Sequence, residues 1–182
     1  MVVVDEQHRF GVEQRNLLSK RQPIPHLLAM SATPIPRTLI MAVYGDMDVS
    51  RIIEKPKNRK KIITLSKPED KIDEVLVFIK KQISIGNQIF WICPLIDESK
   101  ILNYSAAIKK FNFLSKKFPN RVGLIHGSLD KIQKKHVLNN FLNKKIDVLV
   151  STTVIEVGID FANANVIVIE NSDKFGLSQL HQ

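Results

Sequence analysis

The chain has 182 residues, 44 % hydrophobic and 25 % charged, a balance typical of folded globular domains and not of disordered chains. Its apolar runs are too short to cross a bilayer. Its single cysteine, Cys93, excludes an internal disulfide framework and a cysteine-based zinc site, and fits a reducing cytoplasm. The net charge of +9 favours a polyanionic partner, because cations that meet phosphates release counterions. A Lys-rich composition also arises in AT-rich genomes.

The first part of the chain alternates short apolar runs with amphipathic stretches, which is the pattern of parallel α/β units. The expected elements are a strand at Val2–Val4, a helix at 12–20, a buried strand at Leu27–Met30 and a helix at 37–43. Residues 46–61 are polar and basic, as expected for a linker between domains. We therefore predict that residues 1–45 belong to a first parallel sheet, truncated on its N-terminal side.

A second series of α/β units follows the linker. The expected elements are strands at 62–65, 89–93, 122–125, 147–150 and 166–169, and helices at 69–84, 99–117, 130–142 and from 175 onward. The first of these helices places its apolar residues on one face, and Asp130 is positioned to cap another. We predict that residues 62–182 form a second, nearly complete domain. The fold class is therefore α/β, with two open parallel sheets.

Two acidic residues, Asp5 and Glu6, directly follow the first expected strand and precede Gln7 and His8. Ligands bind at the carboxyl ends of strands in parallel sheets. A carboxylate pair there can hold Mg²⁺, usually through water, and polarise an attacking water. Asp5 is the candidate metal ligand, and Glu6 is the candidate group that orients or deprotonates the attacking water. An acidic turn after any strand would give the same letters.

A second candidate site lies at the end of the next expected strand, at Ser31-Ala-Thr33. Small hydroxyl residues at this position can sense a bound nucleotide and relay its state to a neighbouring domain. A helix cap or a turn is the alternative explanation for the same three residues.

Together, these strings resemble the signature motifs of superfamily-two helicases. Within that superfamily they resemble the RecG branched-DNA helicase family and its relative, the transcription-repair coupling factor. The strings that carry the resemblance are Asp5–Val12, Met30–Leu39, Phe90–Ser99, Ser151–Asp160 and Ile169–Gln182. The run Pro94–Ser99 and the pair Glu156 and Gly158 favour RecG over the coupling factor.

The resemblance implies two RecA-like lobes and assigns roles to matching positions. It implies that Asp5 binds Mg²⁺ and that Glu6 acts on the hydrolytic water. The residues implied in coupling nucleotide to the lobe interface are Gln7, His8, Ser31, Thr33, Gly158, Asp160 and Gln182. Those implied in DNA binding are His126, Thr152, Thr153 and Glu156. His126-Gly127 also fits an ordinary strand-to-helix turn, and glycine supports both interpretations.

The resemblance implies an ATP- and Mg²⁺-dependent motor that remodels branched or double-stranded DNA at stalled forks and junctions, in the cytoplasm at the bacterial nucleoid. The 182 residues contain no Gly-x-x-x-x-Gly-Lys-Ser/Thr phosphate loop, and the sixth family motif stops at its first residue, Gln182. We therefore expect the isolated chain to lack useful ATPase activity. The alternatives are the coupling factor's motor, a non-enzymatic DNA-binding remnant, and an unrelated basic α/β domain.

Overall fold

The computed structural model divides into two compact units, and each is described by itself. Unit 1 comprises Met1–Ile62 with Leu177–Gln182, and unit 2 comprises Ile63–Gly176. The structure describes residues 1–5, 25–31, 48–54, 61–94, 100–152 and 161–181. The expected helices at 12–20 and 37–43 lie outside these ranges. The domain limits at 45 and 61 stay predictions.

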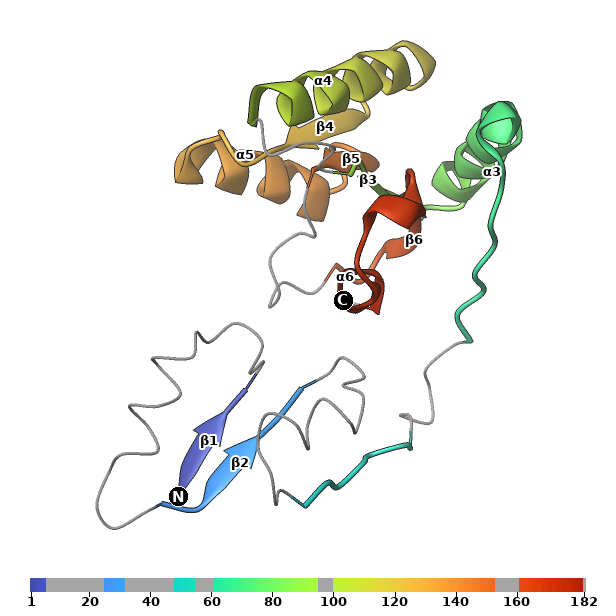
Figure 1. The fold of residues 1–182 in the computed structure, drawn as a ribbon. Coiled ribbons are helices and arrows are strands. Elements are labelled where there is room, and N and C mark those ends of the chain that lie inside the picture. Colours follow the sequence, from blue (N-terminus) through green and yellow to red (C-terminus); the bar gives the residue numbers. More distant parts are fainter. Residues whose placement is uncertain (6–24, 32–47, 55–60, 95–99, 153–160, 182) are drawn as a thin grey trace. The chain divides into compact units, whose positions relative to one another are not determined.

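Unit 1 contains a pair of parallel strands, β1 (Val2–Val4) and β2 (Leu27–Ala29), which confirms both expected strands (Figure 1). Val4 is buried, but Leu28 is 47 % exposed, so the expectation that β2 is buried was wrong. No further described strand pairs with these two. Leu27 and Leu28 remain partly in solvent. The short helix α6 (Leu177–His181) also belongs to this unit.

Unit 2 is a parallel sheet with helices on both faces, as the alternating pattern predicted. Its elements are α3 (Ile72–Ser84), β3 (Gln88–Ile92), α4 (Lys100–Lys117), β4 (Val122–Ile125), α5 (Lys131–Leu142), β5 (Val148–Ser151) and β6 (Ala164–Ile169). The strand order is β4-β5-β3-β6, and every neighbouring pair is parallel (Figure 1). In this order β4 and β6 are the outer strands.

The expected strand at 62–65 is absent, which corrects that expectation. Residues 61–68 form neither helix nor strand, and Ile63 is 79 % exposed. A segment with branched side chains forms a strand only where a neighbouring strand pairs with that segment. No described strand pairs with residues 61–68. A 3₁₀ turn at Glu69–Lys71 then leads into α3.

Alternation of side chains across the strands divides the core of unit 2 between two faces of the sheet. On one face, α3 and α4 pack over Trp91, which is fully buried. On the other face, α5 packs through Phe141, which is also fully buried. The ring centroid of Phe141 lies 5.1 Å from that of Phe90 and 5.5 Å from that of Phe161. The three rings form the centre of this second layer.

Polar contacts fix the ends of α5. Asp130 accepts a hydrogen bond from the Gln133 N–H at 2.7 Å, and the Gln133 side chain accepts from the Asp130 N–H, which confirms the expected cap. At the other end, the buried Gln88 amide donates to the Phe141 carbonyl at 2.6 Å and to the Ile146 carbonyl at 2.9 Å. These bonds join the end of α5 to the start of β3.

A glycine in β4 gives the first prediction. A Cβ added to Gly123 would overlap Ile146 and lie 3.1 Å from Val137 Cγ1, whereas one added to Gly127 would meet nothing within 4 Å. We expect Gly123→Ala to lower the free energy of unfolding by about 1–3 kcal/mol through overpacking. Gly127→Ala is the control, with an expected change within about 0.5 kcal/mol.

Urea unfolding followed by fluorescence measures this effect in unit 2, because the chain's single tryptophan is buried in its core. Equal midpoints for the two alanine variants would show that Ile146 and Val137 yield freely to a larger residue in β4.

Candidate nucleic-acid interface

The carboxyl edge of the unit 2 sheet brings together residues from four strands. His126 follows β4, Thr152 follows β5, Cys93 follows β3 and Glu170 follows β6. The register aligns the strand ends, because Ser151 pairs with Ile125 on one side and with Ile92 on the other. The four residues therefore line the edge in the order His126, Thr152, Cys93, Glu170. This is the edge at which parallel sheets bind ligands.

The first half of this edge contains two of the expected DNA-binding residues. His126 is 8 % exposed and Thr152 is 4 % exposed. Burial, and secondly the positive charge of Lys134, lower the pKa of His126 below its ordinary value of 6.5. Near pH 7 its imidazole is therefore neutral, and suits a hydrogen bond better than an ionic contact with a phosphate. Lys134 itself is close to the turn, with Nζ 3.5 Å from the Gly127 carbonyl.

The second half of the edge contains a polar cluster that the sequence analysis missed. Lys110 of α4 forms an ion pair with Glu170, with Nζ 2.5 Å from Oε1. The same Nζ lies 5.3 Å from the centroid of the Trp91 ring. Burial, and secondly the Glu170 carboxylate, which accepts a hydrogen bond from the thiol, raise the pKa of Cys93 to about 12. The cluster holds α4 to the end of β6.

The cluster had one signal in the sequence. Cys93 and Glu170 each directly follow an expected strand, so they share an edge if those two strands are neighbours. The sequence does not fix that adjacency, and the partner Lys110 is one of eleven lysines and arginines between residues 100 and 145. Only the folded sheet selects it.

In unit 1, two expected nucleotide-site residues come from adjacent strand ends. Asp5 follows β1 and Ser31 lies two residues beyond β2, and the Met30 N–H donates to the Val4 carbonyl at 2.8 Å. Asp5 is exposed, which suits a carboxylate that holds Mg²⁺ through water. Within the described residues no group of three metal-binding side chains occurs. The role of Asp5 in holding Mg²⁺ stays a prediction.

The remaining expected site residues cannot be placed by the structure. Those outside the described residues are Glu6, Gln7, His8, Thr33, Thr153, Glu156, Gly158, Asp160 and Gln182. Their roles stay predictions. No helix in the described part of the chain is long and apolar enough to span a membrane.

Most of the chain matches a family model. Residues 70–182 match the model of the helicase conserved C-terminal domain. The chain belongs to the helicase conserved C-terminal domain family. The match covers nearly all of unit 2, so the carboxyl edge described above lies within this helicase domain.

Curated relatives of this helicase-domain chain extend the similarity to its full length. It is 48 % identical over 184 aligned positions to the ATP-dependent DNA helicase RecG of Thermotoga maritima, of which it covers 24 %. It is also 48 % identical to RecG of Bacillus subtilis, of which it covers 27 %. The chain therefore spans about a quarter of these relatives. The predicted resemblance to RecG is confirmed.

A solved structure supports the fold of the helicase domain. The whole chain aligns with 27 % of the structure of Mycobacterium smegmatis helicase Lhr bound to ssDNA and AMP-PNP, with a TM-score of 0.58 and 17 % identity. At this identity the comparison supports the α/β, RecA-like fold alone.

Proposed function

We propose that this chain is the motor segment of a RecG-type helicase, which uses ATP to remodel branched DNA such as stalled forks and junctions. The observation that carries the proposal is the 48 % identity to RecG over the full chain, including the residues before the family match. RecG relatives from several bacteria support it over the coupling factor. The proposed setting is the bacterial cytoplasm, at the nucleoid.

In this proposal residues 1–45 contribute to the ATP-binding lobe, 46–61 link the lobes, and 62–182 form the second lobe. Asp5 helps to hold Mg²⁺ through water, and Glu6 orients the hydrolytic water. At the carboxyl edge of unit 2, buried His126 and Thr152 are neutral hydrogen-bonding groups near the DNA path. Their burial supports a fixed, preorganised role instead of a mobile electrostatic one.

A chimera tests the proposal. The 182 residues replace the matching quarter of Bacillus subtilis RecG, and ATP hydrolysis is measured with and without a forked DNA. We expect fork-stimulated hydrolysis, and we expect Glu6→Gln in the chimera to lower the turnover rate by about 10²–10⁴-fold, as for loss of a general base.

The isolated 182-residue chain serves as a negative control, because we expect no hydrolysis above its own Glu6→Gln variant. A folded chimera that binds the fork without hydrolysing ATP would contradict the motor proposal. Hydrolysis that persists in the chimera after Glu6→Gln would contradict the role assigned to that residue.

A further inference from the structure

The positive charge of the chain is concentrated in residues 100–147, which comprise α4, β4 and α5. This segment contains eleven Lys and Arg and two Asp, so its net charge of +9 equals that of the whole chain. The rest of the chain contains 16 of the 27 cationic side chains and 16 of the 18 anionic ones, so its charges balance. A genome rich in A and T would add lysine throughout, and it does not explain a segment with so few carboxylates.

The carboxylates of this segment are already engaged within the fold. Asp130 caps α5, and Asp147 pairs with Arg121. Lys110 pairs with Glu170. The other described lysines of the segment form no ion pair with a described carboxylate. They are Lys109, Lys116, Lys117, Lys131, Lys134, Lys135, Lys144 and Lys145, and we call these eight the basic margin.

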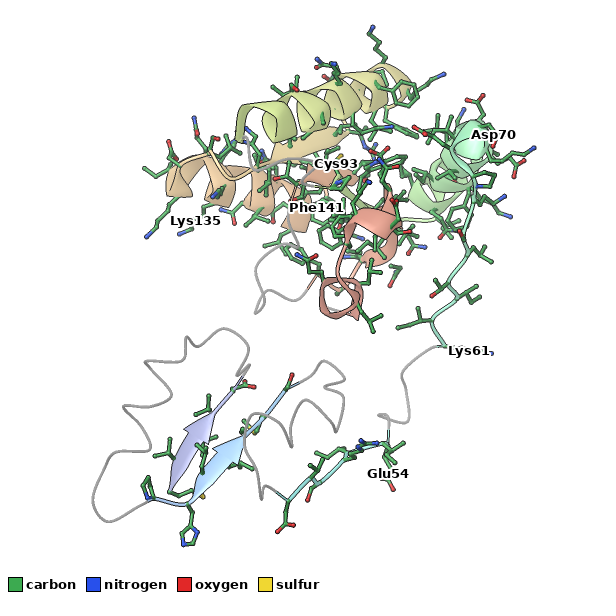
Figure 2. The ribbon with its side chains drawn as sticks, in the orientation of Figure 1. Glu54, Lys61, Asp70, Cys93, Lys135 and Phe141 are labelled. Carbon is green, nitrogen blue, oxygen red and sulfur yellow. The ribbon has the colours of Figure 1, made fainter. Side chains whose placement is uncertain are left out.

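The basic margin lies along one side of unit 2. Its lysines belong to α4, α5 and the turn after α5, and both helices pack against the outer strand β4 from opposite faces of the sheet. Figure 2 shows Lys135 at the end of the unit that is remote from Asp70. Asp70 lies in the 3₁₀ turn that leads into α3, where acidic and basic side chains are mixed. Charge is therefore polarised along the sheet, with its positive side at β4.

Two lysines of the basic margin occupy positions that folding alone does not favour. Lys131 is in the first turn of α5, which has no acidic residue, although a cation there opposes the helix dipole. Lys144 has a φ of 56°, in the left-handed region that favours glycine or asparagine. Lys116 is in the last turn of α4, where a cation is favourable to the helix dipole, so helix stability alone can explain it. Local backbone preferences therefore do not explain a lysine at either position, 131 or 144.

We propose that the basic margin is a contact surface for the phosphate backbone of duplex DNA, separate from the carboxyl-edge residues. The choice of DNA among polyanions rests on the proposed function. Surface lysines act as mobile point charges, so the contact is independent of base sequence and strongly dependent on salt. The 18 residues of α4 extend about 27 Å, close to the rise of roughly eight base pairs.

Salt-dependent binding tests the proposal. In the full 182-residue chain, four margin lysines are changed to glutamine: Lys116, Lys131, Lys135 and Lys144. A matched control changes four lysines of the α3 side instead: Lys67, Lys71, Lys80 and Lys81. Binding of a fluorescein-labelled duplex, without nucleotide, is measured by anisotropy across a KCl series.

The quantity compared is the slope of the logarithm of the binding constant against the logarithm of the KCl concentration. For the margin variant we expect this slope to be shallower by about 0.9 for each phosphate that its side chains no longer neutralise. We expect the control variant to keep the slope of the parent chain. A variant with the same four lysines changed to arginine should also keep it, because its charges remain. Equal slopes for the margin and control variants, whether both reduced or both unchanged, would overturn the proposal.

The two proposals fail separately. A shallower slope in the margin variant, together with a chimera that does not hydrolyse ATP, would support the proposed DNA contact and contradict the proposed motor function. Fork-stimulated hydrolysis by the chimera, together with unchanged slopes, would support the motor function and contradict the proposed DNA contact.

Discussion

Replacing Phe141 with alanine is expected to lower the free energy of unfolding of unit 2 by about 3–5 kcal/mol. The ring is fully buried and contacts Phe90 and Phe161, with centroids 5.1 and 5.5 Å away. Removing it opens a cavity between α5 and the sheet, because Phe90 is fixed in β3 and the closely packed surroundings relax only partly into the space. Urea unfolding followed by the fluorescence of Trp91 measures the change.

The matched control is Ile132→Ala in the same helix. Ile132 is 82 % exposed, so its loss creates no cavity, and the expected change is within about 0.5 kcal/mol. If Phe141→Ala had as little effect as Ile132→Ala, α5 would not pack on the sheet as described.

The thiol of Cys93 is expected to react with Ellman's reagent at pH 8 at least about 10³-fold more slowly in the folded chain than in urea. Only the thiolate reacts. With a pKa of about 12, roughly one thiol in 10⁴ is ionised at pH 8, against about one in four at an ordinary pKa near 8.5. Burial of the sulfur slows the reaction further.

The raised pKa also links the stability of the fold to pH. The folded state favours the protonated thiol, so this stabilisation is complete below about pH 8.5 and is lost as the pH rises toward 12. Glu170→Gln removes a negative charge beside the sulfur and should speed native labelling, though not to the rate in urea, because burial is the larger cause. Equal native and unfolded rates would show that the end of β3 is open to solvent.

Much of unit 2 was predictable from the sequence because its local signals agree with the final packing. The strand at Val122–Ile125 and the Asp130 cap of α5 were placed correctly, since an apolar run and a capping residue act over a few positions. The strand at 62–65 failed because the same local signal, a branched apolar run, needs a neighbouring strand. Burial of β2 failed for a related reason, since exposure depends on what covers the strand.

The candidate site divides in the same way. His126 and Thr152 were predicted through the resemblance to helicase motifs, and the structure aligns the ends of their strands on one edge, while their roles in DNA binding stay predictions. The cluster of Cys93, Lys110 and Glu170 was missed because it requires β3 and β6 to be neighbours in the sheet. These two strands lie far apart in the sequence. Sequence motifs indicate which residues follow strands, and they do not indicate the strand order.

The strand order has a consequence for synthesis of the chain on the ribosome. Both strand partners of β3, which are β5 and β6, follow it in the sequence, so its backbone emerges with no strand to pair with. Roughly 75 residues separate the ends of β3 and β6, which at 5–20 residues per second is an exposure of about 4–15 s. During that interval β3 is a site for chaperone binding or for pairing with another nascent chain.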